Sequence, residues 1–370
     1  MGTVKKRILL IATFPPPVHG SAMVSKYITD SKLFQSEFEF DSVNLSTSRR
    51  MEEIGKNTPI KLFRFMGSYF KLLWLLICHR YSLCYLAITI NGKGFLKDVP
   101  YVLLCKLFGN KIVIHQHNKG MSRFVDRSMY RWLYEHAYKN TRVILLSWYL
   151  YDDISKIVKK EDVIVCPNGT PDVLDTVPQF ERNNDVPHLL YLSNLVESKG
   201  ILVLLDAVKI LRGKGVKLLC DIIGGDTQEI STDRFANEIA SRGIQDMVGY
   251  HGKQYGDDKN KFWQIADVFV FPTYYYNECF PLVLLEAMEQ GVPCISTDEG
   301  GIMDIIEQDK TGKVVAKQDA GALAAAIEEL LSNPESRVNM GRAGYEKYIR
   351  YFTLQTFEKN ITEIFKTQVK

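Results

Sequence analysis

Two glutamates eight residues apart, Glu278 and Glu286, stand where a loop passes into a helix, and both carboxylates could bind a polar ligand. Pro281 fits the first position of that helix, where its missing N–H costs nothing, and Gly291 fits the C-terminal end. The free N–H groups and the positive dipole end of such a helix bind phosphate. Glu286 is surrounded by apolar helix residues, so its carboxylate needs a partner, and ligand hydroxyls are a reasonable source. The alternative is two solvated glutamates at a spacing common by chance.

A lysine that precedes a helix is the second candidate. Lys199 lies in the segment 193–200, between an expected strand and an expected helix. A cation in a first helical turn opposes the dipole, so this position is easier to explain if Lys199 binds an anion such as phosphate. The alternative is an exposed lysine that bends into solvent. Gly225 follows the strand expected over 218–223, and Lys253 follows Tyr250-His251-Gly252. At both places the backbone could line a nucleotide or form a plain turn.

Two loops in the first half of the chain are weaker candidates. The loop 14–22 contains His19 and Gly20, and a glycine allows a ligand to approach the backbone closely. Neither Gly-x-Gly-x-x-Gly nor Gly-x4-Gly-Lys-Ser/Thr occurs, so the dinucleotide and P-loop fingerprints are missing. His115 and His117 end another strand and share one of its faces. No acidic or cysteine partner lies nearby for a metal, which leaves a structural and a catalytic role open for them.

Short apolar strands alternate with helical stretches in both halves of the chain, and these elements must position the candidates. This alternation is typical of parallel sheets covered on both faces. We therefore expect an α/β protein with two doubly wound, Rossmann-like domains. Ligands of such sheets bind beyond the carboxyl ends of the strands, in a cleft. Single helices are expected over 60–79 and 121–138.

The domain boundary is expected at the Pro-Asn-Gly-Thr-Pro stretch 167–171. It divides the chain into an N-terminal domain, 1–168, and a C-terminal domain, 169–349. The length of 370 residues agrees with two domains, because single cores stop growing at roughly 250–300 residues.

Composition excludes several other classes of protein. Hydrophobic residues make up 46% and charged residues 24%, as in folded proteins rather than disordered ones. The longest apolar run, Leu72–Cys78, is far shorter than the roughly 20 residues of a membrane span, and no signal peptide is recognisable. The seven cysteines are scattered and indicate neither a disulfide framework nor a zinc site. We expect a cytoplasmic protein.

Charge is divided unequally along the chain. Residues 1–168 hold 25 Lys+Arg and 13 Asp+Glu, a net +12, and the remainder has a net −9. A basic half suits an anionic partner such as a phosphate, a nucleic acid or a membrane surface, although it could serve solubility alone. The stretch 60–79 mixes aromatic and basic residues, which suits either a helix lying on anionic lipid or a core helix on the sheet. The core helix is the more ordinary interpretation.

Taken together, these segments resemble the retaining GT-B glycosyltransferases of glycosyltransferase family 4, also called glycosyl transferases group 1. The resemblance covers essentially the whole chain and depends on the order of its motifs. These are Pro167-Asn168-Gly169, Ser198-Lys199-Gly200, Glu278-x7-Glu286 followed by Ala287-Met288-x-x-Gly291-Val292-Pro293, Gly300-Gly301, Ile305–Glu307 and Thr311-Gly312.

The resemblance implies a nucleotide-diphosphate-sugar donor, bound mainly by the C-terminal domain. Lys199 and the N–H groups of Phe280 and Leu282 would hold the diphosphate, Glu286 the ribose and Glu278 the donor sugar. The full set that we assign to donor binding is Gly20, Asn194, Lys199, Gly225, Lys253, Glu278, Cys279, Phe280, Pro281, Leu282 and Glu286. The residues assigned to catalysis are His117, Lys199 and Glu278.

On the same resemblance, the N-terminal domain would bind the acceptor, and a final helix, 350–370, would cross back onto it. The residues assigned to the acceptor side are His19, His115, Asn118 and Lys119. The basic charge of this domain suits a glycan or a polyprenyl-diphosphate-linked acceptor, as in the synthesis of bacterial surface polysaccharides such as O-antigen or capsule. Peripheral contact with the inner face of the plasma membrane is a further hypothesis, and no nucleic acid is expected as a partner.

One departure from the family pattern concerns the diphosphate. The family has Gly-Arg-Leu where this chain has Ser193-Asn194-Leu195, and an asparagine supplies no guanidinium charge. No Asp-x-Asp occurs in the chain, so we expect metal-independent transfer without a cofactor. Two alternatives stay open: a sugar-nucleotide epimerase or hydrolase of the same fold, and a binding subunit without catalysis.

Overall fold

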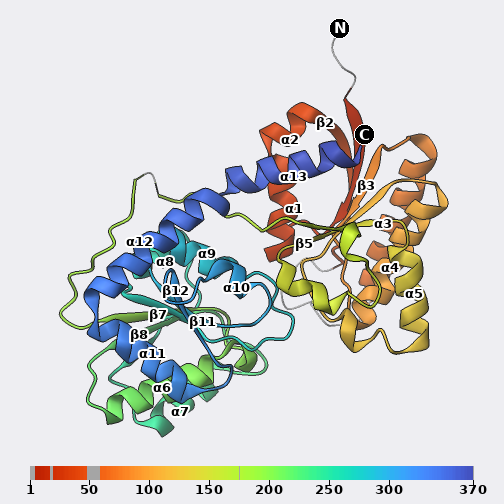
Figure 1. Cartoon of the computed structure of the whole chain (residues 1–370). Helices are drawn as coiled ribbons and strands as arrows, with labels where there is room; N and C mark the ends of the chain where they lie inside the picture. Colours follow the sequence, from red (N-terminus) through yellow and green to blue (C-terminus); the bar gives the residue numbers. More distant parts are fainter. Residues whose placement is uncertain (1–4, 17–19, 48–58, 175, 370) are drawn as a thin grey trace. The chain divides into compact units, whose positions relative to one another are not determined.

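The chain folds into two compact units in a computed structural model that describes residues 5–16, 20–47, 59–174 and 176–369 (Figure 1). The first unit comprises Met1–Asn168 together with Leu354–Lys370, and the second comprises Gly169–Thr353. The segment that returns to the first unit begins at Leu354 rather than at residue 350. The reason is that the preceding helix continues to Tyr351 and packs within the second unit.

The first unit is built on a six-stranded parallel sheet with the order β2-β1-β3-β4-β5-β6. Its four inner strands are mostly buried apolar runs, as expected where helices cover both faces, whereas the two edge strands are only partly buried. The strands are β1 Lys6–Ala12, β2 Phe38–Asn44, β3 Leu83–Leu86, β4 Ile112–His115, β5 Arg142–Leu145 and β6 Val163–Val165. The helices are α1 Gly20–Asp30, α2 Lys32–Glu37, α3 Pro59–Cys78, α4 Gly92–Leu107, α5 Ser128–Tyr138 and α13 Leu354–Gln368, with 3-10 turns η2 Met121–Arg123, η3 Trp148–Asp153 and η4 Lys160–Asp162.

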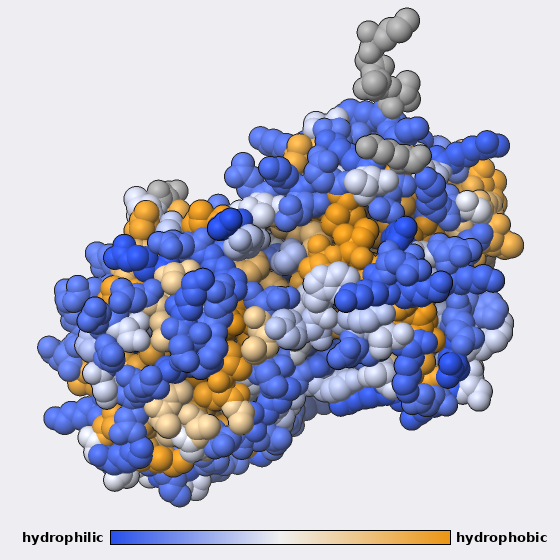
Figure 2. Space-filling model, viewed as in Figure 1, coloured by the Kyte–Doolittle hydropathy of each residue, from blue (hydrophilic) through white to orange (hydrophobic). Residues whose placement is uncertain are grey.

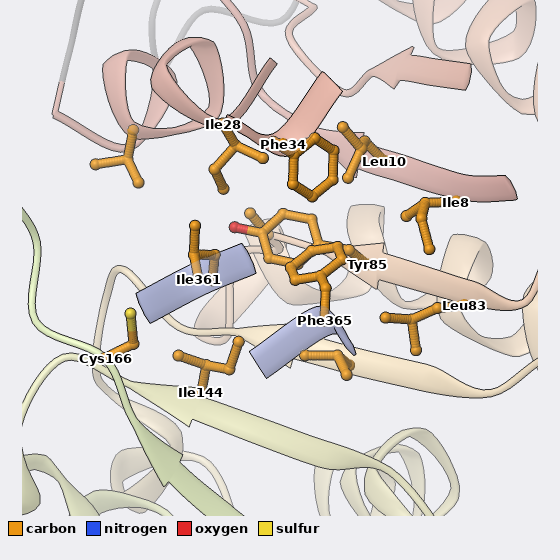
Figure 3. Packing of buried hydrophobic residues seen from close by; sticks show 14 of the residues in the cluster. Ile8, Leu10, Ile28, Phe34, Leu83, Tyr85, Ile144, Cys166, Ile361 and Phe365 are labelled. Atoms are coloured by element: carbon orange, nitrogen blue, oxygen red, sulfur yellow. The ribbon is translucent and has the colours of Figure 1, made fainter. Parts of the chain in front are cut away.

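The last helix of the chain packs against α1, α2 and the sheet of the first unit. Figure 3 shows Phe34 of α2, Tyr85 of β3 and Phe365 of α13 close together, and the ring centroid of Phe365 lies 5.2 Å from that of Phe34 and 5.3 Å from that of Tyr85. Ile8 and Leu10 of β1 belong to the same buried cluster. Helices α1, α2 and α13 thus cover one face of this sheet, and α3, α4 and α5, which contact one another in turn, follow the right-handed crossovers on the other.

The prediction of a single helix over residues 121–138 is wrong. The structure has a short 3-10 turn, η2, and then α5 from Ser128. The carboxylate of Asp153 explains the break, because it accepts hydrogen bonds from the N–H groups of Gly120, Met121 and Ser122 at 2.8–3.2 Å. These bonds hold the backbone in a tight turn that begins at Gly120, whose φ is +126°.

The second unit repeats the plan with a parallel sheet of order β12-β11-β10-β7-β8-β9. The strands are β7 His188–Leu192, β8 Leu219–Ile223, β9 Val248–Tyr250, β10 Val268–Phe271, β11 Cys294–Thr297 and β12 Gly312–Val315. The helices are α6 Ile201–Gly213, α7 Thr232–Arg242, α8 Gly256–Ile265, α9 Leu282–Glu289, α10 Ile302–Ile305, α11 Ala320–Ser332 and α12 Pro334–Tyr351, and the 3-10 turn η5 spans Glu197–Lys199. The expected doubly wound α/β architecture is confirmed for both units.

Among the described residues, no helix combines the length and apolar character required to cross a bilayer.

Candidate active site

The candidate residues of the second unit follow neighbouring strands. Because the sheet is parallel, the segments that leave β7, β8, β9, β10 and β11 all start at its carboxyl edge. Lys199 follows β7, Gly225 follows β8 and Lys253 follows β9, whereas Glu278 and the start of α9 follow β10. The sheet order places β10, β7, β8 and β9 side by side, so these loops share one edge.

The turn that contains Lys199 is fixed to the loop after β10. Gly200 has a φ of +84°, and a Cβ atom there would lie 2.1 Å from the carbonyl oxygen of Pro272. The carbonyl of Ser198 accepts hydrogen bonds from the N–H of Tyr274 at 2.8 Å and the hydroxyl of Thr273 at 3.4 Å. Only glycine therefore fits at position 200, and the close approach sets where Lys199 projects.

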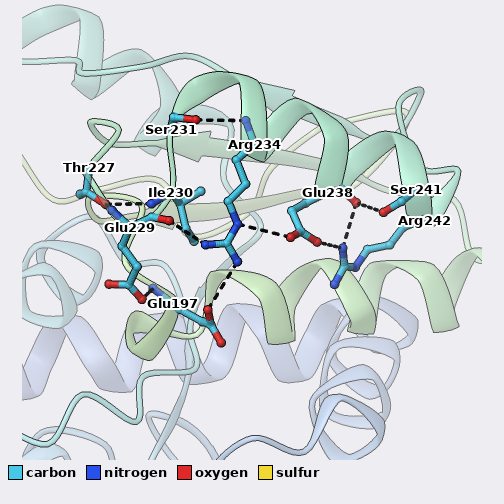
Figure 4. A network of polar contacts seen from close by, with 9 residues as sticks. All are labelled: Glu197, Thr227, Glu229, Ile230, Ser231, Arg234, Glu238, Ser241 and Arg242. Atoms are coloured by element: carbon cyan, nitrogen blue, oxygen red, sulfur yellow. Dashed lines mark hydrogen bonds and ion pairs between the residues drawn. The ribbon is translucent and has the colours of Figure 1, made fainter.

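A polar network holds the other side of the same turn (Figure 4). The N–H of Glu197 donates to Oε1 of Glu229 at 3.0 Å. Arg234 of α7 donates to the carbonyl of Glu229 at 2.6 Å and lies 3.6 Å from the carboxylate of Glu197. The ion pair is about half exposed and adds little stability by itself, so its role is to define the orientation of η5.

Lys199 and Glu278 form an ion pair at the carboxyl edge. Nζ of Lys199 lies 2.5 Å from Oε2 of Glu278, and these side chains are 20% and 11% exposed. The ammonium also lies over the ring of Tyr275, 4.5 Å from its centroid, and 5.5 Å from that of Phe271. The structure thus brings together a cation suited to an anionic group and an acceptor suited to hydroxyl groups.

The start of α9 presents backbone donors next to this pair. Pro281 is the N-cap residue and the helix begins at Leu282, one position later than expected, whereas Gly291, with a φ of +66°, ends it as predicted. Among the described residues, the N–H groups of Phe280 and Leu282 have no hydrogen-bond acceptor. A free N–H at Leu282 is usual in a first helical turn, and Phe280, one residue before the N-cap, adds a second donor that could bind an anion.

The segment before α9 is packed from two sides. The carbonyl of Cys279 accepts a hydrogen bond from the N–H of Gly301 at 2.7 Å, and the ring of Phe280 contacts that of Phe352 with centroids 5.7 Å apart. Gly300 approaches so closely that a Cβ atom there would lie 2.3 Å from the carbonyl oxygen of Glu278. The buried residues Cys279 and Phe280 therefore support the segment that precedes α9.

Glu286 has a protein partner that the sequence did not reveal. Nζ of Lys259, on α8, lies 2.9 Å from Oε2 of Glu286, and both side chains are about a quarter exposed. We expected a buried Glu286, but its side chain is partly exposed. The buried glutamate of α9 is Glu289, which accepts hydrogen bonds from the N–H groups of Val173 and Leu174. Burial raises the pKa of Glu289 above its usual value.

Asn194 lies where the family pattern has arginine, and it bonds to the backbone. Its Oδ1 accepts a hydrogen bond from the N–H of Gly225 at 3.1 Å, and the N–H of Leu195 donates back to the Gly225 carbonyl at 2.8 Å. Lys253 crosses the same glycine, since a Cβ atom on Gly225 would lie 2.1 Å from its Cε. In the described part of the chain, the exposed ammonium of Lys253 forms no ion pair.

The histidines of the first unit lie together at the end of β4. The rings of His115 and His117 are 4.0 Å apart, and Nδ1 of His115 lies 2.8 Å from the Tyr85 hydroxyl. His115 is fully buried, and burial, followed by the charge of His117, lowers its pKa well below the usual value. His115 is therefore held neutral beside the half-buried His117.

The other site residues predicted in the first unit are Asn118, Lys119, Gly20 and His19, and the structure describes three of them. Asn118 accepts a hydrogen bond from the N–H of Ile90 at 3.0 Å, and the carbonyl of Lys119 accepts one from Asn91 at 2.9 Å, so both stabilise the loop after β3. Gly20 opens α1, is exposed, and has no atom within 4 Å of an added Cβ. His19 lies outside the described residues. No group of three or more His, Cys, Asp or Glu in the described ranges is arranged to hold a metal ion.

Comparison with solved structures supports the fold over nearly the whole chain. A glycosyltransferase from Rickettsia africae superposes with a TM-score of 0.77 at 18% identity, covering 99% of both chains. Anabaena HepE, solved in complex with UDP, gives a TM-score of 0.73 at 15% identity and covers 98% of this chain and 100% of its own. Together with the two parallel sheets, these likenesses define the GT-B fold.

Comparison of sequences relates the second unit to a known protein family. Residues 172–347 match the family model described as Glycosyl transferases group 1. The capsular polysaccharide biosynthesis glycosyltransferase CapM of Staphylococcus aureus is 29% identical over 180 residues, which are 49% of this chain and 46% of CapM. The chain thus spans less than half the length of that relative. The second unit contains a glycosyl transferases group 1 domain.

Proposed function

We propose that this protein is a glycosyltransferase that moves a sugar from a nucleotide-diphosphate-sugar to a hydroxyl group of a glycan or lipid-linked acceptor. The observation that carries the proposal is the Lys199–Glu278 pair beside the free N–H groups of Phe280 and Leu282, within a glycosyl transferases group 1 domain. A cation, backbone donors and a carboxylate at one loop edge suit a diphosphate joined to a sugar.

The chemistry follows from where charge develops. As the bond between the sugar and the diphosphate breaks, negative charge grows on the departing phosphate and positive charge on an oxocarbenium-like sugar. The ammonium of Lys199 and the N-terminal end of α9 stabilise the departing phosphate. The carboxylate of Glu278 accepts from sugar hydroxyls, and Glu286, oriented by Lys259, accepts from the ribose.

Lys253 supplies the positive charge that Asn194 lacks. Its stem crosses Gly225, and Asn194 holds the N–H of that same glycine, so the ammonium lies in the neighbourhood where an arginine at position 194 would extend. Two lysines on different loops, after β7 and after β9, rather than an arginine and a lysine on one loop, would then neutralise the diphosphate. This arrangement needs no metal ion.

The acceptor and the stereochemistry complete the proposal. The resemblance to glycosyltransferase family 4 supports transfer with retention of configuration, with His117 near the anomeric carbon and the residues His115, Asn118 and Lys119 toward the acceptor. The names of relatives such as CapM, and the net +12 of residues 1–168, support an anionic, lipid-linked glycan in bacterial surface polysaccharide synthesis at the cytoplasmic face of the membrane.

Donor turnover tests the proposal directly. Thermal unfolding with UDP-, GDP-, ADP- and dTDP-sugars should identify one donor, because a ligand at 100 times its dissociation constant adds about 2.7 kcal/mol of stability. That donor is then incubated with membrane lipid extract and with buffer alone. Transfer of the sugar to lipid supports the proposal. Epimer or free sugar formed in buffer at the same rate would indicate an epimerase or a hydrolase, and donor binding without any turnover a binding subunit.

A further inference from the structure

Helix α3 exposes an apolar stripe on the first unit. Its exposed residues include Phe63, Phe70, Trp74 and Ile77, whose side chains are 77%, 58%, 59% and 66% exposed. Spacings of seven, four and three residues place them on one side of a helix. Figure 2 shows apolar surface, in orange, in the region where Figure 1 draws α3.

The opposite side of α3 accounts for its attachment to the fold. Phe65 and Tyr69 pack their rings on Tyr101 of α4, with centroids 5.7 and 5.6 Å away, and the hydroxyl of Ser68 lies 2.6 Å from that of Tyr101. Of the helix residues only Leu72, Leu75 and Leu76 are buried. The interpretation of the stretch as an ordinary core helix is therefore right for one face only, and the stripe is not needed for packing.

Positive charge borders the stripe. No Asp or Glu occurs between Glu53 and Asp98, whereas seven Lys or Arg do. At the margin toward β2, Lys71 donates to the carbonyl of Ser42 and Arg64 to that of Thr47, both at 2.8 Å. Their ammonium and guanidinium groups are thus held beside the apolar side chains, and α3 itself contains no acidic residue.

We propose that this face of α3 docks in the plane of a lipid bilayer that contains anionic lipids. Large apolar and aromatic side chains would enter the boundary between headgroups and acyl chains, and the bordering cations would pair with lipid phosphates. A protein partner of this chemistry would need an apolar groove lined with carboxylates. A bilayer offers apolar depth and a negative surface to an outward-facing helix without such a groove, and so suits it better.

Docking through this surface would bring the protein to the membrane that holds the proposed lipid-linked acceptor, and this part of the inference rests on the proposed function. Its own evidence lies in the first unit and is separate from the donor residues of the second. Vesicle binding and donor binding can therefore fail independently, which distinguishes the two proposals.

Sedimentation with vesicles tests the surface. The full chain is mixed at low ionic strength with vesicles of equimolar phosphatidylglycerol and phosphatidylcholine, or of phosphatidylcholine alone. We expect binding to the anionic vesicles to be at least about tenfold stronger and to weaken with salt. The double variant Phe63→Ser/Trp74→Ser should lose at least about tenfold in binding. The matched control Tyr255→Ser removes an aromatic side chain that is 76% exposed on the second unit, and it should bind like the wild type.

Tryptophan fluorescence locates the contact. The chain has four tryptophans, and the variant Trp132→Phe/Trp148→Phe keeps only the exposed Trp74 and the buried Trp263. Anionic vesicles should shift its emission to the blue. Each of three results would overturn the proposal: wild-type binding by the Phe63→Ser/Trp74→Ser variant, no shift from Trp74, or a stable dimer in buffer that the same variant abolishes. Unchanged thermal unfolding of the variant shows that it is folded.

Discussion

The ammonium of Lys199 and the carboxylate of Glu278 are 2.5 Å apart although 79 residues separate them in the chain. The contact joins the loop after β7 to the loop after β10, two strands that are neighbours in the sheet but not in sequence. Parallel strand order therefore explains why two motifs that are distant in sequence lie at one place.

Replacing Lys199 should disable the donor site without unfolding the protein. Lys199→Ala removes the cation nearest to Glu278 and to the start of α9, and we expect kcat/KM for donor turnover to fall about 100-fold. Steady-state kinetics measures the loss. Lys217→Ala, on an exposed lysine without an ion pair among the described residues, is the control and should leave turnover unchanged. Equal turnover by both variants would contradict the assignment.

If Lys253 takes the place of the arginine that the family has at position 194, then an arginine at 194 should restore donor binding to a variant that lacks Lys253. Lys253→Ala should weaken donor binding about tenfold, which corresponds to about 1.4 kcal/mol. Adding Asn194→Arg should restore most of that affinity, because the guanidinium returns to the position the family pattern uses. Titration calorimetry with the donor measures both. If Asn194→Arg improves the wild type as much as the Lys253→Ala variant, the two positions do not replace one another.

The pair of Lys259 and Glu286 should behave as a coupled unit. Glu286→Ala should raise the donor dissociation constant about tenfold, through loss of an acceptor for the ribose. Lys259→Met should raise it less, because it changes only the orientation of the carboxylate. The double variant should then lose no more than Glu286→Ala alone, since residues in contact are not additive. Strictly additive losses in a double-mutant cycle would show that Lys259 acts on its own.

The close approach at Gly200 predicts a large effect from one methyl group. Gly200→Ala places a Cβ against the Pro272 carbonyl at a positive φ, so we expect a loss of about 2 kcal/mol and a Tm lower by about 4–8 °C. Gly213→Ala, at the end of α6 with nothing within 4 Å, is the matched control and should leave Tm unchanged or slightly higher. Calorimetry that found the two variants equally stable would contradict the packing described.

The burial of His115 predicts how stability depends on pH. The pKa of His115 in the folded state lies well below the ordinary 6.5. Below pH 6.5 the unfolded state therefore binds a proton at this imidazole, whereas the folded state keeps it neutral. This contribution to stability is complete above pH 6.5 and is lost as pH falls, at up to about 1.4 kcal/mol per pH unit. Denaturant unfolding of wild type and His115→Phe between pH 6.5 and 5.5 should show a shallower slope in the variant. Parallel slopes would mean that His115 titrates normally.

The fold was predictable because its signals are local and strong. Buried parallel strands such as β1 and β10 are continuous apolar runs, and the proline- and asparagine-rich junction after Cys166 marks the change of unit. Elements without such signals were missed. Strand β9 has three residues, and α8 begins with the polar run Gly-Asp-Asp-Lys-Asn-Lys.

The site was predictable only for residues that follow a strand or open a helix. Lys199 and Glu278 have such positions, and the structure places them in contact. Lys259 was missed because its pairing with Glu286 depends on how α8 packs, which no spacing in the sequence encodes. The sequence left the exposure of α3 open between two interpretations for a similar reason, because periodicity shows that a helix has two faces but not which of them the fold covers.

Titration of the identified nucleotide-sugar into wild type, Lys199→Ala and Lys217→Ala tests the central claim most directly. We expect wild type and Lys217→Ala to bind one donor per chain with equal affinity, and Lys199→Ala to bind it at least about tenfold more weakly. If no nucleotide-sugar binds the wild type, or if Lys199→Ala binds it as well as Lys217→Ala, then the edge formed by Lys199, Glu278 and α9 is not the donor site.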